Sequence, residues 1–369
     1  MQTINVELGE RSYPIHIGAG ILQRAGELIG QQQTTSQLML VTNPIVDQFW
    51  SAPVTESLEQ AGFTFKKIIV PEGERYKTLS TFNRIIAKML HARCDRETIV
   101  IALGGGVIGD LAGYVAAAYM RGVRFIQMPT TLLAQVDAGI GGKVGVNHRL
   151  GKNMIGAFHQ PKMVLIDTDT LQTLPQRELI CGLAEIIKHA VIADRTYFDT
   201  LEKNLPQILS LDSHLLTAII TRSCEIKAEI VGRDEREELG VRALLNFGHT
   251  IGHALEAAGK FETLRHGEAV LLGMFAEAYL SKASGKLPAA DFQRLDDLLR
   301  RIPLNVALAG MSMEELGHYM QRDKKARRST TRLVLLRAIG AAEFTADWPQ
   351  ECLRDALQYA AAAGKQKLI

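Results

Sequence analysis

The strongest constraint on the fold is an apolar run, 98–103 (TIVIAL), that leads directly into Gly104, Gly105 and Gly106. Such a run is typical of a strand buried on both faces of a parallel sheet. With Gly109 the glycines complete a G-x-G-x-x-G pattern, which lets the backbone approach a pyrophosphate at a helix N-terminus. A tight strand-to-helix turn would explain the same glycines, and no acidic residue follows about twenty positions later to hold a ribose. The motif predicts an α/β fold and leaves nucleotide binding open.

Short apolar runs alternate with helical periodicity through the first half of the chain. Strands are expected at 37–42, 65–70, 98–103, 125–128 and 163–166, and a helix at 80–92. This alternation indicates a mostly parallel sheet covered by helices. Beyond about residue 175 helical periodicity dominates, with one possible strand at 331–336. Because 369 residues exceed one usual core, we expect a Rossmann-like α/β domain, 1–175, followed by an all-helical domain, 176–369.

Composition excludes several classes of protein. The net charge of +2 is too small to indicate a nucleic-acid or membrane partner. The four cysteines are scattered and form no C-x-x-C pair, which favours reduced thiols over disulfides or a cysteine zinc site. The N-terminus lacks a signal-peptide pattern, and the most apolar stretch carries Asp110 among its glycines. We therefore expect a cytoplasmic protein.

The stretch 121–161 is rich in glycine and carries two lysines that each follow a glycine, Lys143 and Lys152. It holds more glycine than a helix or a strand usually tolerates. Ammonium groups beside exposed backbone N–H donors suit an anionic small molecule that carries carboxylate or phosphate. A mobile surface loop would explain the same composition, but Asp137 and Asn153 add polar groups that favour a binding site.

Two histidines, His249 and His253, lie four positions apart and share one face of an expected helix. A catalytic zinc takes about three N or O ligands and keeps one position open. Spacing leaves three ligand sets, of which the first is His249 and His253 with a carboxylate. The second is His249 and His266 with Glu185, and in the third Glu268 provides the carboxylate instead. Alternatively, these histidines cap helices or form hydrogen bonds within the core.

Six segments have the sequences GGGVIGD, RGVRFIQMPTTLLAQVDAGIGGKVGVN, GKNMIGAFHQP, LAEIIKHA, LLNFGHTIGHA and HGEAV, in this order. Together they resemble the 3-dehydroquinate synthase family over nearly the whole chain. The resemblance implies an NAD-binding α/β domain followed by a helical metal-binding domain. It also implies one divalent metal, Zn2+ or Co2+, held by Glu185, His249 and His266, with His253 left on the substrate side.

The resemblance further assigns two sets of residues. The expected NAD+ contacts are Asn43, Glu74, Lys77, Gly105, Gly106, Val107, Asp110, Thr130, Thr131, Lys143, Lys152 and Thr173. The expected catalytic and substrate-binding residues are Arg121, Asp137, Lys143, Lys152, Asn153, Lys188, Lys227, Arg242, Asn246, His253 and Lys324, with Lys325 as an alternative to the last. Among these, Arg242, Lys143 and Lys227 are expected toward the substrate carboxylate, and Lys152, Asn153 and Arg121 toward its phosphate.

The family reaction converts 3-deoxy-D-arabino-heptulosonate 7-phosphate to 3-dehydroquinate and phosphate, a carbon–oxygen lyase step of the shikimate pathway to aromatic amino acids. The resemblance thus implies an anionic sugar-phosphate substrate, transient oxidation by NAD+ and a homodimer. Two alternatives stay open. One is a related sugar-phosphate cyclase of the deoxy-inosose or valiolone type, against which Arg242 and Asn246 argue. The other is a polyol dehydrogenase of the iron or glycerol dehydrogenase type.

Overall fold

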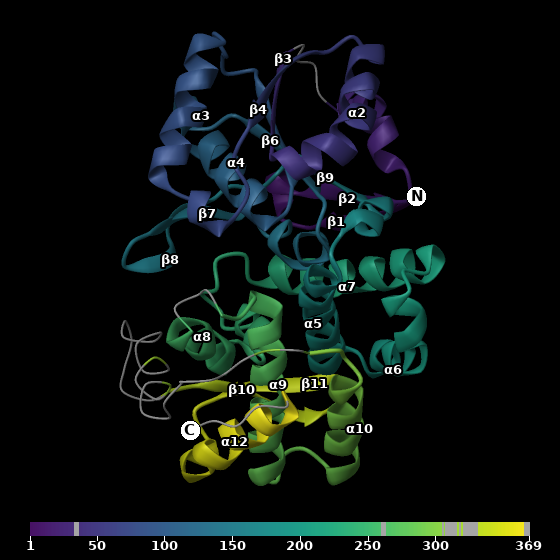
Figure 1. The fold of residues 1–369 in the computed structure, drawn as a ribbon, viewed down its shortest axis with the longest axis vertical. Helices are drawn as coiled ribbons and strands as arrows, with labels where there is room; N and C mark the ends of the chain where they lie inside the picture. The colour runs from purple at the N-terminus through teal and green to yellow at the C-terminus, as the bar shows by residue number, and fades with distance from the viewer. Residues whose placement is uncertain are drawn as a thin grey trace. The chain divides into compact units, whose positions relative to one another are not determined.

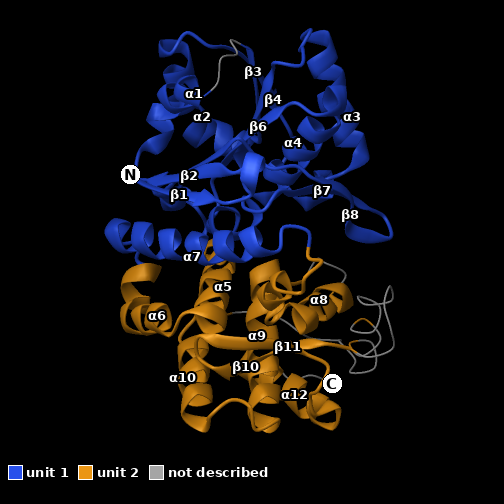
Figure 2. Cartoon of the chain, turned by 180° about the vertical axis from the view of Figure 1, so that it is seen from behind, with its two compact units in different colours: residues 1–175, 210–236 blue, residues 176–209, 237–369 orange. Residues whose placement is uncertain are grey.

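The computed structural model describes residues 1–32, 37–259, 263–304, 306, 316, 319 and 331–364 (Figure 1). The chain forms two compact units, which Figure 2 shows in two colours. Unit 1 comprises 1–175 and 210–236, and unit 2 comprises 176–209 and 237–369. One change of unit coincides with the domain boundary expected after residue 175. The segment 210–236, expected in the second domain, belongs to the first unit instead.

Unit 1 contains a seven-stranded sheet in the order β1-β2-β9-β6-β5-β3-β4. The strands are β1 (Gln2–Val6), β2 (Tyr13–Gly18), β3 (Gln37–Thr42), β4 (Thr64–Ile69), β5 (Ile99–Gly104), β6 (Arg124–Pro129) and β9 (Met163–Asp167). Only β1 pairs antiparallel, so the expected mostly parallel sheet is confirmed. The sequence did not predict β1, because this largely exposed edge strand has no continuous apolar run.

Helices cover both faces of this sheet. They are α1 (Ala25–Gln32), α2 (Pro44–Gln60), α3 (Leu79–His91), α4 (Gly106–Ala118) and α7 (Ser213–Arg233). In β5, Ile101 contributes to the core with α1 and α2, while Val100 contributes to the core with α3 and α4. Burial on both faces explains the continuous apolar run. Because the helices that follow β3 and β5 lie on opposite faces, these neighbouring strands form a topological switch point.

The glycine-rich stretch forms an antiparallel hairpin of β7 (Lys143–His148) and β8 (Gly151–Phe158). The interpretation that it holds too much glycine for a strand was therefore wrong. Gly145 pairs with Gly156 across the hairpin. A Cβ atom on Gly145 would lie 2.5 Å from the Ile155 carbonyl oxygen, and one on Gly156 would lie 2.2 Å from the Val144 carbonyl oxygen. Only glycine allows these two backbones to approach so closely.

Unit 2 is mainly helical, with α5 (Gln176–Ala193), α6 (Arg195–Leu209), α8 (His249–Ala258), α9 (His266–Ala283), α10 (Ala289–Arg300) and α12 (Leu353–Ala363). It is not all-helical, because β10 (Leu333–Ala338) and β11 (Ala341–Thr345) pair as an antiparallel hairpin. The possible strand at 331–336 corresponds to β10. The apolar side chains of this strand are buried, which gives it a hydrophobic core to pack against.

Helix α9 contacts α5 and α8 at very short range through glycines. A Cβ atom on Gly273 would lie 1.9 Å from the Gly248 carbonyl oxygen. One on Gly267 would lie 2.3 Å from Cα of Cys181. These close contacts determine where the N-termini of α8 and α9 lie relative to α5.

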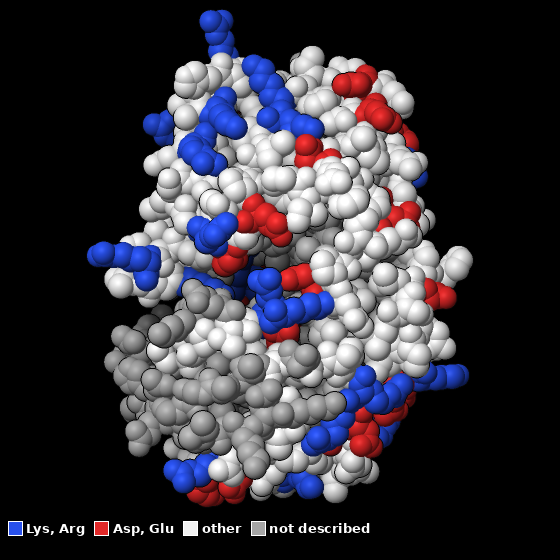
Figure 3. Space-filling view, viewed as in Figure 1, with Lys and Arg blue, Asp and Glu red and all other residues white. Residues whose placement is uncertain are grey.

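Charge on unit 1 is mixed in sign. Figure 3 shows Lys and Arg side chains gathered over α3 and β4, and Asp and Glu side chains gathered beside α2. No helix in the described ranges has the length and apolarity needed to cross a membrane.

Candidate functional site

Three side chains of unit 2 converge in one cluster. Glu185 lies on α5, and His249 and His266 are the first residues of α8 and α9. Oε1 of Glu185 lies 3.5 Å from Nε2 of His249 and 3.6 Å from Nε2 of His266. One potential ligand atom from each residue lies within 4.8 Å of the other two. The cluster therefore offers two imidazole nitrogens and one carboxylate oxygen to a single point.

The protonation states of these three residues favour the binding of a cation. Burial alone would raise the pKa of Glu185, but the Lys188 ammonium holds it well below its usual range. Burial lowers the pKa of His249 to about 3, which keeps this ring neutral. Burial opposes the charged form of His266 as well, but carboxylates, among them Glu185, raise its pKa to about 10. At neutral pH the cluster thus holds an ionised carboxylate, one neutral ring and one exchangeable proton.

The donor set fits a divalent metal. Oε1 of Glu185 is buried and makes no hydrogen bond within the described ranges, although it faces both histidine rings. A buried carboxylate oxygen without a donor is costly unless a cation occupies the space before it. Two imidazoles and one carboxylate are ligands that zinc and cobalt accept. The arrangement supports the ligand set that the family resemblance implied.

The second nitrogen of each ring is held by the protein. Nδ1 of His249 lies 3.1 Å from the Phe247 carbonyl oxygen, and Nδ1 of His266 lies 3.1 Å from Oε2 of Glu256. Such contacts fix the ring and its tautomer so that Nε2 faces the metal. Sequence reasoning missed Glu256. A signal was present, because it lies two turns after His249 on the same helix face.

The alternative ligand sets have other environments. Both carboxylate oxygens of Glu268 bind Arg177, at 2.6 and 2.7 Å, and one also accepts from the Arg265 backbone N–H. Glu268 thus caps α9 and is already neutralised. His253 can form a further three-ligand group with Glu256 and His266, with atoms within 4.8 Å of one another. Since His266 Nδ1 is already matched to Glu256, we assign His253 to the surroundings of the cluster.

The expected NAD+ contacts follow the carboxyl ends of the parallel strands of unit 1. Asn43 follows β3, Glu74 and Lys77 follow β4, Gly105, Gly106, Val107 and Asp110 follow β5, Thr130 and Thr131 follow β6, and Thr173 follows β9. In open α/β sheets this edge holds ligands at the switch point. The side-chain oxygen of Asn43 caps α2 by accepting from the Val46 N–H at 3.0 Å. The structure brings these residues together at one edge.

The glycine loop at this edge has no room for side chains. A Cβ atom on Gly105 would lie 2.9 Å from Cγ2 of Thr131, and one on Gly109 would lie 2.8 Å from Oε1 of Gln127. Gly105 is the N-cap of α4 and makes no side-chain cap, so the first N–H groups of the helix have no side-chain partner there. These groups and the close backbone suit a pyrophosphate, and the residues present fit a dinucleotide.

Polar groups link this edge to the β7–β8 hairpin. The Lys77 ammonium binds the carboxylate of Asp110 and the side-chain oxygen of Asn153. Lys77 is only 4% exposed, and burial raises the pKa of Asp110 against the effect of this ammonium. The buried Lys77 therefore binds both Asp110, an expected NAD+ contact, and Asn153, an expected substrate contact.

Further expected residues lie on separate elements. The Lys227 ammonium on α7 binds the backbone oxygen of Asp137 at 2.6 Å and its carboxylate. This contact supports the correspondence for Lys227. In unit 2, Arg242 is buried and Nε lies 3.5 Å from Oε1 of Glu237. Asn246 ends the same short 3-10 helix, three residues before His249.

One expected residue is not brought to these sites, and another lies outside the part of the chain that the structure describes. Arg121 lies in the turn between α4 and β6, at the amino edge of the sheet and thus opposite the glycine loop. Its φ is +69°, a strained value for a residue with a side chain. Lys324 and its alternative Lys325 lie outside the described residues.

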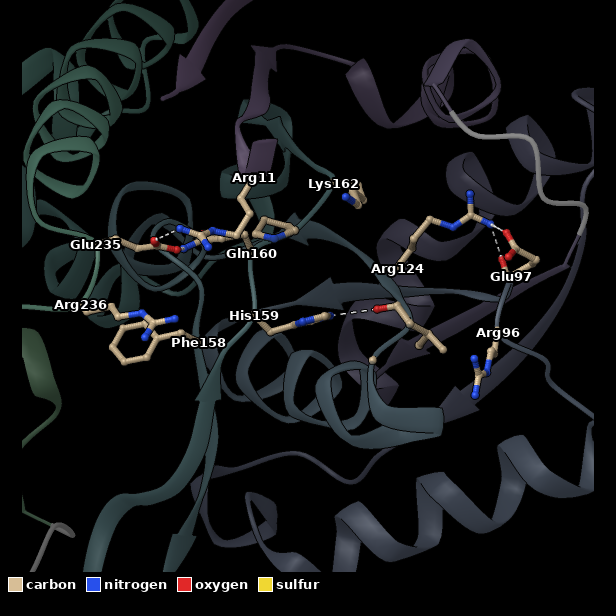
Figure 4. A pocket seen from close by; sticks show the side chains of 13 residues that line it. Arg11, Arg96, Glu97, Arg124, Phe158, His159, Gln160, Lys162, Glu235 and Arg236 are labelled. Carbon is tan, nitrogen blue, oxygen red and sulfur yellow. Dashed lines mark hydrogen bonds and ion pairs between the residues drawn. The ribbon is translucent and has the colours of Figure 1, made fainter. Parts of the chain in front are cut away.

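A separate cavity of about 640 Å³ opens at the amino edge of the sheet (Figure 4). Arg11 and Gln160 point toward Glu235 and bind its carboxylate at 2.7 and 2.9 Å. His159 Nε2 lies 2.9 Å from the Val123 carbonyl oxygen. None of the expected site residues lines this cavity, so it does not belong to the candidate site.

Solved structures with this fold include cyclases and dehydrogenases. The 2-epi-5-epi-valiolone synthase from Streptomyces hygroscopicus subsp. jinggangensis 5008, with NAD+ and Zn2+ bound, matches with a TM-score of 0.86 and 29% identity over 96% of this chain and 98% of that one. A 2-deoxy-scyllo-inosose synthase matches with a TM-score of 0.85 and 24% identity, over 96% and 99%. Glycerol dehydrogenase from Schizosaccharomyces pombe matches with 0.68 and 19% identity, over 95% and 89%. Among these three structures the two sugar-phosphate cyclases match with higher TM-scores than the dehydrogenase, so the fold resembles the cyclase class more closely.

Sequence comparison gives the family within this class. The N-terminal model of 3-dehydroquinate synthase matches residues 67–181, and the C-terminal model matches 182–326. A 3-dehydroquinate synthase from Hydrogenovibrio crunogenus (strain DSM 25203 / XCL-2) is 49% identical over 358 residues, which cover 97% of this chain and 99% of the relative. The chain belongs to the 3-dehydroquinate synthase family.

Proposed function

We propose that this chain converts 3-deoxy-D-arabino-heptulosonate 7-phosphate to 3-dehydroquinate and phosphate. The observation that carries this proposal is the buried Glu185, His249 and His266 cluster with Lys188 beside it, in a chain of this family. Both Glu185 and Lys188 are almost fully buried, and the ammonium binds one carboxylate oxygen while the other faces the histidines. Buried charges of this kind, with perturbed pKa values, are concentrated at functional sites.

The cofactors in this proposal are NAD+ at the carboxyl edge of the sheet and Zn2+ or Co2+ at the histidine cluster. When bound, they supply a hydride acceptor that is regenerated and a Lewis acid for the reacting oxygen. Gly105 and Gly106 present backbone N–H groups to the dinucleotide. In this proposal Glu185 holds negative charge next to the reacting centre, and Lys188 donates a hydrogen bond to a substrate hydroxyl.

The basic residues bind the two anionic ends of the substrate in this proposal. Arg242, Lys143 and Lys227 are assigned to the carboxylate, and Lys152 and Asn153 to the phosphate. His253 lies beside the cluster, with its ring centroid 5.4 Å from that of His249, and can hold or pass a proton there. The substrate phosphate can itself accept a proton during elimination, which removes the need for a separate strong base.

We also propose a homodimer in which Arg121 serves the partner's site. Strand β6 lies between Arg121 and the carboxyl edge of its own sheet, a span of about 20 Å that an arginine side chain does not bridge. Large apolar side chains are exposed at Met120 (40%), next to Arg121, and on β8 at Met154 (73%) and Phe158 (45%). Light scattering tests the dimer. Coexpressed Arg121→Ala and Lys152→Ala chains should recover activity that neither variant has alone.

Phosphate release from the heptulosonate substrate tests the proposed function directly. The expected result is release that needs NAD+, stops after chelation, returns with Zn2+ or Co2+, and leaves no net NADH. A polyol dehydrogenase would instead accumulate NADH without releasing phosphate. Full phosphate release after complete removal of the metal would contradict the assignment of the cluster.

A further inference from the structure

Asn147 uses both ends of its side-chain amide to join two segments of unit 1. Its Nδ2 donates to Oε1 of Glu74 at 2.7 Å, and its Oδ1 accepts from the backbone N–H of Asn153 at 2.9 Å. Its own backbone N–H donates to the Lys77 carbonyl oxygen at 2.8 Å. A strand bridge between Thr78 and Asn147 adds to this connection. Asn147 thus links the loop after β4 to the β7–β8 hairpin, in addition to the hydrogen bond between Lys77 and Asn153.

The partner in the hairpin is held in an unusual conformation. Asn153 has a φ of +54°, a left-handed value that asparagine adopts more readily than most residues but that still needs support. Its backbone N–H is fixed by Asn147, and its side-chain oxygen accepts from the Lys77 ammonium. Since Lys77 and Glu74 belong to one short segment, each side of Asn153 is tied to that same segment.

We infer that Asn147 is a positioning residue that couples dinucleotide binding to phosphate binding. This inference rests on the proposed function, which assigns Glu74 and Lys77 to NAD+ and Asn153 to the substrate phosphate. A dinucleotide that fixes the segment of Glu74 also fixes Asn153 through the amide of Asn147. The reverse holds too, because coupling between two binding equilibria is reciprocal. In this proposal Glu74 does not contact the substrate phosphate, and Asn153 does not contact NAD+.

Two substitutions of Asn147 distinguish its hydrogen bond to Glu74 from its hydrogen bond to Asn153. Asn147→Ala removes both hydrogen bonds. Asn147→Asp keeps an oxygen that accepts from the Asn153 N–H but replaces the donor to Glu74 by a carboxylate, which repels it. Asn83 is an exposed asparagine of α3 and provides the matched control, Asn83→Ala.

The measurement is the dissociation constant of NAD+ by titration calorimetry, without and with saturating inorganic phosphate, on the full-length protein. In the wild type and in Asn83→Ala, phosphate should tighten NAD+ binding by about fivefold or more, within the range typical of coupled sites. In Asn147→Ala and Asn147→Asp this ratio should fall toward one, because the amide no longer joins Glu74 to Asn153, while the hydrogen bond between Lys77 and Asn153 remains. Asn147→Ala should weaken phosphate binding itself, whereas Asn147→Asp should weaken mainly NAD+ binding.

Turnover gives a second result that loss of stability alone would not produce. The KM for the heptulosonate substrate should rise in Asn147→Ala by a larger factor than kcat falls, because bound substrate can still restore the position of Asn153. An unchanged ratio of NAD+ constants in both variants, or a wild-type ratio of one, would overturn the inference. If Asn147→Ala does not fold cooperatively, the ratio in Asn147→Asp decides. A wild type that shows coupled binding but releases no phosphate would contradict the proposed function and leave the coupling intact.

Discussion

Nδ1 of His266 lies 3.1 Å from Oε2 of Glu256, and this carboxylate is buried on the neighbouring helix α8. The contact leaves Nε2 of the same ring directed at Glu185, 3.6 Å away. Glu256 therefore orients one expected metal ligand, raises its basicity and leaves its Nε2 available to a metal.

The variant Glu256→Gln tests this role. We expect the affinity for Zn2+ to fall about 10- to 100-fold, as for other carboxylates behind a histidine ligand. Competition with a fluorescent chelator measures this affinity without turnover. Asp296→Asn removes a buried carboxylate elsewhere in unit 2 and should leave the affinity unchanged. Equal Zn2+ affinities in Glu256→Gln and wild type would show that the carboxylate of Glu256 does not affect metal binding through His266.

Metal binding should depend on pH because one ligand starts protonated. The pKa of His266 is raised to about 10 in the metal-free protein, so below that pH a metal must displace its proton. The apparent affinity should then rise about tenfold per pH unit between about pH 7 and 9. His249 adds no slope in this window, since its pKa is about 3. Calorimetry in buffers of different ionisation enthalpy should detect about one released proton, and an affinity independent of pH would refute the prediction.

Removing the Lys77 ammonium should destabilise unit 1. Lys77→Met leaves the Asp110 carboxylate without its cation, and these side chains are only 5% and 18% exposed. Breaking a buried pair costs about 3–5 kcal/mol of unfolding free energy, measurable by urea denaturation. Lys67→Met breaks the more exposed pair with Asp47 and should cost less than about 1 kcal/mol. Adding Asp110→Asn to Lys77→Met should recover part of the loss, and no recovery would argue against an unpaired carboxylate as the cause.

A methyl group should not fit between α8 and α9. In Gly273→Ala the new Cβ would lie 1.9 Å from the Gly248 carbonyl oxygen, so the two helices must separate. We expect a loss of about 1–3 kcal/mol or more together with weaker Zn2+ binding, because His249 and His266 begin these helices. In Gly30→Ala the nearest atom would be 3.9 Å away on Phe63, and this α1 variant should be as stable as wild type. Equal thermal stability and zinc affinity in both variants would contradict this reading.

The parts of the fold that were predictable are those in which local sequence and burial agree. Strand β5 is buried on both faces and therefore has an unbroken apolar run, and its glycines mark the turn into α4. The β7–β8 hairpin was missed because its cross-strand glycines are required by a close backbone approach that no local pattern shows. The contact of Lys227 with Asp137 joins residues ninety positions apart, so only the fold reveals it.

The candidate metal centre shows the same limit. Helical spacing indicated that His249 and His253 share a face, but it could not choose between His253 and His266 as the second histidine ligand. That choice came from the family resemblance, and the geometry supports it because Nε2 of His266 faces Glu185. The role of Glu256 depends on how α8 meets α9, which the one-dimensional pattern does not contain.

The return of α7 to unit 1 has a consequence for how the chain is made. Residues 176–209 leave the ribosome before residues 210–236, which unit 1 needs for completion. Unit 1 therefore cannot close over Asp137 with Lys227 while only its first 175 residues have emerged. During synthesis the first helices of unit 2 therefore emerge while unit 1 is still incomplete. A nascent chain stalled near residue 200 is expected to expose this incomplete domain to chaperones and proteases.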